Sequence, residues 1–150
     1  MQLIHLAIKK VINTFFSEKY RILIGLDQKF QGLFKFIKAT SNSKYERIFL
    51  VSERIIYKLE TFNITSFQWA IAIDSIDAIK LSKDNKCLLV LLVKSNINKK
   101  ILSEKKLSIN SKDQYDFNFK YSEDLLEVVF LLKKNIYNIN NSKTLVKIIS

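Results

Sequence analysis

Residues 44–60, KYERIFLVSERIIYKLE, contain two short apolar runs that are separated only by Ser52 and Glu53. Both runs are rich in β-branched and aromatic residues, and two residues leave no room for a helix between them. Another apolar run, 30–37, comes before them, on the far side of the small polar stretch 40–43. The pattern predicts a basic antiparallel meander of three strands, around which we expect the rest of the chain to fold.

Similar runs recur along the chain, most of them a few residues apart, which favours antiparallel hairpins. We predict seven strands in this region, at 30–37, 46–52, 54–60, 67–73, 78–81, 88–94 and 115–121. Two stretches instead show the period of an amphipathic helix, at 3–20 and 123–136. A short final strand is expected at 144–149.

The second helix carries the clearest signals. Ser122 is a suitable N-cap, and acidic residues follow it where the helix dipole favours anions. One apolar stripe contains Leu125, Val128, Val129, Leu132 and Ile136. About seven strands followed by one helix predict a mainly β fold with α, a bent antiparallel barrel of the pleckstrin-homology-like kind closed by its C-terminal helix. The predicted organisation is an N-terminal amphipathic helix at 1–24 and the barrel domain at 25–150.

The charge balance points to an anionic partner. The 150 residues include 25 Lys and Arg against 14 Asp and Glu, a formal net charge of +11. A hydrophobic share of 48% with 26% charged residues is typical of a globular domain that buries its own core. Such an excess of positive charge favours nucleic acid, anionic lipid or an acidic protein as partner. The alternative is that the excess positive charge only makes the protein more soluble.

Residues with catalytic or metal-binding chemistry are scarce. The chain has one cysteine, Cys87, one histidine, His5, two glycines and no proline. One cysteine and one histidine give no support for a catalytic Cys–His pair and are too few for a structural zinc site. Two glycines are too few for a glycine-rich phosphate loop. We therefore expect no enzyme activity and no cofactor. The longest apolar run, 87–93, is too short to span a bilayer, and the first ten residues lack the order of a signal peptide. We therefore expect a cytoplasmic protein that is peripheral at membranes.

Three segments carry a family resemblance: RIFLVSERIIYKLE (47–60), FQWAIAIDSIDAIKLSKDNKCLLVLLV (67–93) and YSEDLLEVVFLLKKNIYNI (121–139). They resemble the tail-homology-1 domain of class I myosins, and the resemblance extends over residues 31–150. It differs where the family has glycine and proline, because this chain has Ala78 and Ala72 there. The stretch IKKVINTFFSEKY (8–20) is similar to a degenerate calmodulin-binding helix.

The resemblance implies a pleckstrin-homology-like domain that binds anionic phospholipids, including phosphoinositides, beside the first hairpin. The matching positions are Lys35 before the turn and Arg47 after it, with Lys38 and Lys44 at the edges of the loop. If the hairpin is centred on Ser41, Lys35 lies directly opposite Arg47, and an anion between them would relieve their repulsion. Solvated lysines on a wet face are the alternative interpretation.

A second basic patch lies in residues 94–112, which we expect to form a loop on the same rim as the first hairpin. It has six lysines against the single Glu104, and the proposed lipid-binding residues are Lys99, Lys100, Lys105 and Lys106. Several lysines near an anionic leaflet attract it without a specific pocket, at about 1 kcal/mol each. A solvated loop without function is the alternative.

Two other functions compete with lipid binding. The first is a protein-interaction domain of the same fold, with a myosin motor, another cytoskeletal protein or a light chain as partner. The second is nucleic-acid binding, which we do not expect because the strand aromatics fit a core better and no RNA-binding signature is present. The sequence thus favours a non-enzymatic membrane-targeting module.

Overall fold

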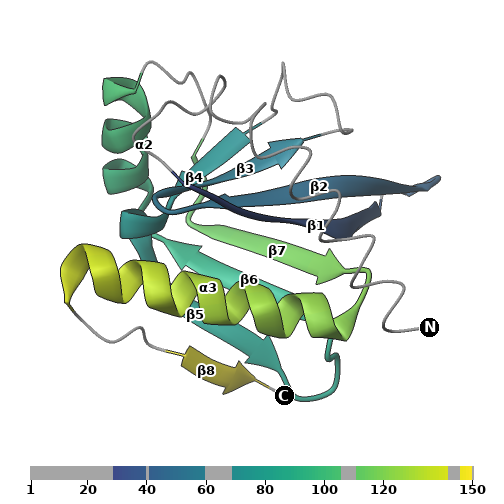
Figure 1. The fold of residues 1–150 in the computed structure, drawn as a ribbon. Helices are drawn as coiled ribbons and strands as arrows, with labels where there is room; N and C mark the ends of the chain where they lie inside the picture. The colour runs from purple at the N-terminus through teal and green to yellow at the C-terminus, as the bar shows by residue number, and fades with distance from the viewer. Residues whose placement is uncertain (1–28, 40, 60–68, 106–110, 142–145, 150) are drawn as a thin grey trace.

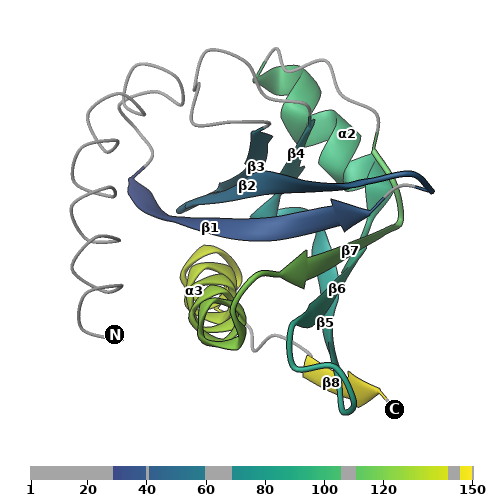
Figure 2. The same cartoon turned by 90° about the vertical axis from the view of Figure 1, so that its right-hand side faces the viewer.

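The fold is a strongly bent antiparallel sheet wrapped around one long helix (Figures 1 and 2). The computed structural model describes residues 29–39, 41–59, 69–105, 111–141 and 146–149. The strands are β1 (Phe30–Ala39), β2 (Lys44–Ser52), β3 (Ile55–Leu59), β4 (Trp69–Ala72), β5 (Ile76–Ser82), β6 (Leu88–Val93), β7 (Gln114–Phe119) and β8 (Val146–Ile149). The helices are the short 3-10 turn η1 (Ile73–Ser75), α2 (Ser95–Glu104) and α3 (Ser122–Asn140).

The eight strands form one sheet in the order β4-β3-β2-β1-β7-β6-β5-β8. All pairs are antiparallel except β5 with β8, which run parallel. The seven strands and the C-terminal helix are therefore present as predicted. Within the described ladder, β4 and β8 are the two edges, so the barrel is bent but not closed by hydrogen bonds. The strand β8 is the short final strand expected at 144–149, and it extends the sheet beside β5.

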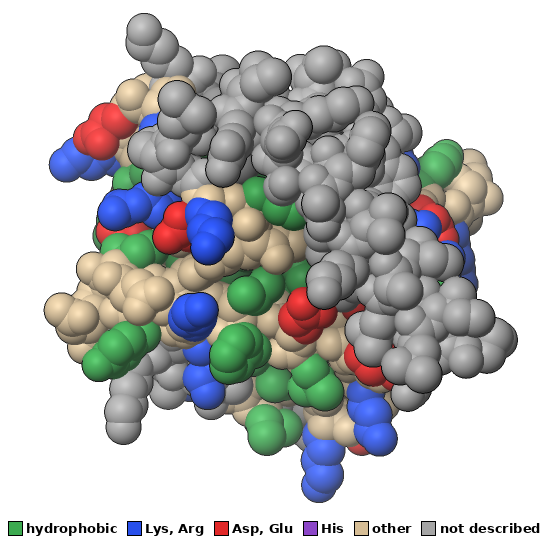
Figure 3. Space-filling model, viewed as in Figure 1, with side chains coloured by type: hydrophobic (Ala, Val, Ile, Leu, Met, Phe, Trp, Pro, Cys, Tyr) green, Lys and Arg blue, Asp and Glu red, His purple; other side chains and the backbone are tan. Residues whose placement is uncertain are grey.

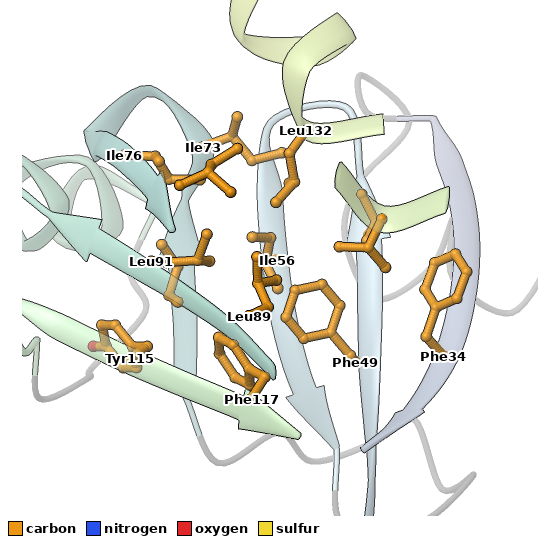
Figure 4. Close-up of a cluster of buried hydrophobic side chains, with 14 of the residues drawn as sticks. Phe34, Phe49, Ile56, Ile73, Ile76, Leu89, Leu91, Tyr115, Phe117 and Leu132 are labelled. Carbon is orange, nitrogen blue, oxygen red and sulfur yellow. The ribbon is translucent and has the colours of Figure 1, made fainter. Parts of the chain in front are cut away.

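The inner face of the sheet and α3 enclose the main core. Phe49 packs edge-on against Phe117 and Phe119, with ring centroids 4.9 and 5.2 Å apart, and so joins the two halves of the bent sheet. Figure 4 shows Leu132 of α3 facing this cluster. The predicted helix stripe is buried as expected, apart from the half-buried Val129.

The outer face of β1 to β4 is also buried. Leu33, Ile48, Leu50 and Leu59 lie on it and form a second cluster with Leu102 of α2. Burial on both faces explains why these strands have continuous apolar runs instead of strict alternation. In contrast, β7 alternates buried aromatic with exposed polar residues, because only its inner face is covered.

Several predicted boundaries are wrong. The stretch 94–112 is not a loop, because α2 forms within it and Asn98 on α2 accepts a hydrogen bond from the Ala72 amide at 2.7 Å. Tyr121 rather than Ser122 is the N-cap of α3, and no side chain caps the helix there. The helix also continues to Asn140 and ends at Asn141, which has φ 53°, so the last turn lies beyond the predicted end. The predicted N-terminal helix lies outside the described residues.

Candidate functional site: a cationic mouth at the open end of the sheet

The register of the β1–β2 hairpin decides which basic residues can act together. Lys35 is paired with Ile48 and Arg47 with Phe36, so the hairpin is centred between Ser41 and Asn42. The predicted direct pairing of Lys35 with Arg47 is therefore wrong by one residue. Because side chains alternate along a strand, that shift places the two cations on opposite faces of the sheet.

On the outer face, Lys35 belongs to a cluster that contains a carboxylate. Glu46 Oε1 lies 2.5 Å from Nζ of Lys120, and Glu46 Oε2 lies 3.9 Å from Nζ of Lys35. The hydrogen bond from Lys120 is the main reason that the pKa of Glu46 is lowered, and the pKa of Lys120 is raised by the same contact. Glu46 therefore supplies the negative charge that this pair of lysines needs.

The inner face at the same end of the sheet has a different charge pattern. Lys58 of β3 continues the inward-facing row of Ile56, and its side chain is only 4% exposed. Burial lowers the pKa of Lys58 to about 8, and the positive charges of Lys38, Arg47 and Lys112 act in the same direction. Among the described residues, the charged groups that shift this pKa are thus all cations.

Arg47 is half-buried beside this lysine. Its Nη1 donates a hydrogen bond to the backbone carbonyl of Glu46 at 3.0 Å, and its guanidinium lies 5.0 Å from the centre of the Tyr45 ring. In the part of the chain that the structure describes, Nε of Arg47 is the one buried side-chain nitrogen or oxygen without a hydrogen-bond partner. A buried unsatisfied donor in a native protein is rare and calls for an explanation such as a water or an anion.

We call Lys38, Arg47, Lys58 and Lys112 the cationic mouth. Two of these residues, Lys38 and Arg47, belong to the β1–β2 hairpin, whose tip lies on the opposite side of the molecule from α3 (Figure 2). Arg47 can direct two donors to one phosphate, and the lysines add point charges at different depths. The arrangement is suited to a compact, multiply charged anion.

The structure brings together only part of the predicted site. Arg47 and Lys38 lie in the mouth, Lys35 lies on the outer face, and Lys44 is exposed at the hairpin tip. Of the basic patch at 94–112, Lys112 reaches the mouth, although it was not among the predicted site residues. Lys58 was also missed, and the signal for it was a single lysine inside the otherwise buried run Ile55–Leu59.

The lysines of the second patch lie elsewhere. Lys99 and Lys100 are exposed on α2, and Lys106 lies outside the described residues. Lys105 lines a cavity of about 370 Å³ with Arg54, which follows the opposite end of β2 from the hairpin tip. The expected common rim with the first hairpin is therefore wrong for Lys105.

Two further features of the described residues bear on other kinds of function. None of the described helices is long and apolar enough to cross a membrane. The described residues contain no group of three or more His, Cys, Asp or Glu side chains placed to hold a metal ion.

Known structures share this fold. No protein-family model matches the sequence, and no curated protein matches it either. The hSac2 domain from the human phosphoinositide phosphatase Sac2 is similar at a TM-score of 0.59 and 12% identity, over 93% of this chain and 89% of that one. The PH domain from TgAPH matches at 0.50 and 14% identity, over 87% and 97%.

A larger protein also contains the fold. The structure of the PDZ-RhoGEF DH/PH domains in complex with activated RhoA is similar at a TM-score of 0.55 and 10% identity, over 82% of this chain. This chain spans 33% of that one. Identities this low establish the fold alone: the chain has a pleckstrin-homology-like fold, as the sequence predicted, and nothing in the comparisons points to a myosin tail in particular.

Proposed function

We propose that this chain is a non-catalytic binding module that holds the phosphorylated headgroup of an anionic lipid, such as a phosphoinositide, in the cationic mouth. One observation carries the proposal: Lys58 is buried on the inner face of the sheet, and the positive charges of Lys38, Arg47 and Lys112 all act on it. Like charges in a partly desolvated site repel one another, which disfavours the empty protein. A phosphate group among them would remove this repulsion and give the buried Nε of Arg47 an acceptor.

The lysines outside the mouth would add attraction of a less specific kind. Lys44 at the hairpin tip is exposed and would lie beside a membrane that the mouth approaches. Lys99, Lys100, Lys105 and Lys106 would contribute to the general attraction of a chain with a net charge of +11 for anionic surfaces. Peripheral association with membranes follows from the proposal, and so does a cytoplasmic location.

A second candidate function is binding of another protein by the same fold. The observation that favours it is a row of large exposed apolar side chains on α3, on the far side from the mouth. A myosin motor, another cytoskeletal protein or a light chain stays a hypothesis that rests on the sequence resemblance alone. Binding of a protein at α3 and of a lipid at the mouth do not exclude each other.

The test compares Arg47→Ala with Lys86→Ala, which removes one exposed cation from the β5–β6 turn. Co-sedimentation with phosphoinositide vesicles should show at least a tenfold loss of affinity for Arg47→Ala, about 1.5–3 kcal/mol, because a bidentate phosphate contact is lost. Lys86→Ala should change the affinity by less than about twofold. Equal losses for both variants would mean that only diffuse charge attracts the vesicle.

A second arm of the experiment separates a headgroup site from general attraction to lipid. A soluble inositol polyphosphate should compete for the wild-type protein, because it carries the same phosphates without the acyl chains. Vesicles in which phosphatidylserine supplies the same total charge should bind more weakly and should not distinguish the two variants. A failure of the soluble headgroup to compete would contradict a mouth that recognises phosphate.

A further inference from the structure

The outward face of α3 carries a row of large apolar side chains in water. Leu126, Phe130 and Tyr137 are 65%, 67% and 55% exposed, and their spacing of four and seven residues places them on one side of the helix. Hydrophobic patches are visible on the face of the molecule over α3 in Figure 3, with charges of both signs near them. Single exposed apolar residues are ordinary, but a contiguous row often indicates an interaction site.

The charged residues on this face are separated by sign, with acidic residues in the first half of the helix and basic residues in the second half. The exposed Glu123 and Glu127 lie before Phe130, and the exposed Lys133 and Lys134 lie after it. A membrane surface would repel the acidic half, and a partner of one charge sign would repel one half or the other. A second copy of the same helix, running antiparallel, matches both halves at once.

Residue counts on the helix support this match. Consider two copies of α3 packed antiparallel, with the two-fold axis passing beside Phe130. Glu127 lies three residues before Phe130 and Lys134 lies four residues after it, and both side chains are on the same side of the helix. Glu127 of one copy therefore comes beside Lys134 of the second copy, and the contact occurs twice by symmetry. Glu123 in turn comes beside Tyr137 of the second copy.

A cavity lies where that tyrosine would arrive. A groove of about 600 Å³ borders the start of α3, between the helix, the β5–β6 turn and β8. Its lining includes Leu81, Leu88, Leu126 and Ile148, together with Ser122 and Glu123 beside the expected position of the incoming tyrosine ring. An aromatic side chain that fills an apolar pocket is a common anchor of protein interfaces.

We propose that the chain forms a homodimer through α3, with the two helices antiparallel, Phe130 on the two-fold axis and Tyr137 of each copy in the groove of the other. A helix of 19 residues is roughly 28 Å long, and one such helix pair buries less area than a standard interface. The dimer is consequently weak and depends on protein concentration. The proposal does not depend on the function of the mouth.

Sedimentation velocity over a wide range of protein concentration tests the dimer. The wild type should show reversible monomer–dimer behaviour, and Phe130→Asp should weaken association by more than about tenfold, because two carboxylates would meet on the axis. Tyr137→Ala should weaken it as well, through the empty groove. A matched control is Tyr45→Ala, which removes an exposed aromatic residue at the other end of the molecule.

Charge reversal gives the sharper test. One variant carries Glu123→Lys and Glu127→Lys, and the other carries Lys133→Glu and Lys134→Glu. Each should be monomeric alone, because both halves of its helix then have one sign, whereas an equal mixture of the two should form a heterodimer. Circular dichroism and thermal unfolding check that each variant is folded before association is measured.

Three results would overturn the proposal. They are a wild type that stays monomeric at the highest concentration reached, a dimer that survives Phe130→Asp, and charge-reversed variants that do not associate when mixed. A monomer whose binding to neutral and anionic vesicles falls on Phe130→Asp would instead assign the face to a lipid surface. If the protein is monomeric and Phe130→Asp does not change vesicle binding, the outward face of α3 would be assigned to binding of a different protein.

Discussion

The two faces of the β1–β2 hairpin hold positive charge in different ways. On the outer face, Lys35 and Lys120 share Glu46, so the charges compensate each other within the fold. On the inner face, Arg47 and Lys38 join Lys58 and Lys112, and the described charges acting on Lys58 are all positive. Two residues of equal formal charge on neighbouring strands thus have different expected roles, stabilisation for Lys35 and ligand binding for Arg47.

The largest expected effect comes from Lys58→Met, which keeps an unbranched side chain, one atom shorter, and removes its charge. Affinity for phosphoinositide vesicles should fall by about tenfold or more, because a charge-assisted contact in a partly buried site is lost. The free energy of unfolding at neutral pH should rise by about 1–3 kcal/mol, since a buried cation with a pKa of about 8 no longer opposes folding.

Chemical denaturation and vesicle binding measured on the same variant check this prediction. A loss of binding together with a loss of stability would indicate that Lys58 is a structural residue. A gain of stability with unchanged binding would remove Lys58 from the mouth.

The next largest effect is expected on the affinity for the phosphate ligand when the pH is raised. In the free protein the pKa of Lys58 is about 8, and a bound phosphate would raise it toward the usual value of a lysine. Below pH 8 the ammonium is charged in both states, so the affinity is at its maximum. Above pH 8 binding must take up a proton, and the affinity should fall by up to about tenfold per pH unit.

Isothermal titration with a soluble inositol polyphosphate at pH 7 to 9.5 measures this fall, and Lys58→Met should abolish it. Protein stability should change in the opposite sense over the same range. Because the folded pKa lies below that of the unfolded chain, the charge on Lys58 opposes folding below about pH 8, and this effect disappears as the pH rises toward 10.5. An affinity that stays constant up to pH 9.5 would contradict the assignment of Lys58 to the mouth.

The smallest effect on binding is expected for Lys35→Ala. Its ammonium lies on the outer face near Glu46, so phosphoinositide affinity should fall by no more than about threefold, against the tenfold loss for Arg47→Ala. Vesicle co-sedimentation of both variants under identical salt conditions measures the contrast. Equal losses for Lys35→Ala and Arg47→Ala would mean that the two faces of the hairpin do not differ in function.

Local sequence patterns were sufficient to predict most of the fold. The spacing of Leu125, Val128, Leu132 and Ile136 determined the buried face of α3, because helix periodicity depends only on neighbours in the chain. The same applies to the alternation in β7. The helix α2 was missed because its few buried positions, Asn98 and Leu102, form a weak apolar pattern, and its packing on β4 and η1 holds it in place.

The candidate site was predicted less well, for a reason that the hairpin makes clear. The sequence by itself determined that Arg47 and Lys38 lie near the first turn and that the chain is strongly basic. Only the tertiary structure decided the register, and a shift of one residue moves every side chain of a strand to the other face. The effect of the Lys112 charge on Lys58 likewise depends on the tertiary structure, because Lys58 belongs to β3 and Lys112 comes just before β7, far away in the sequence.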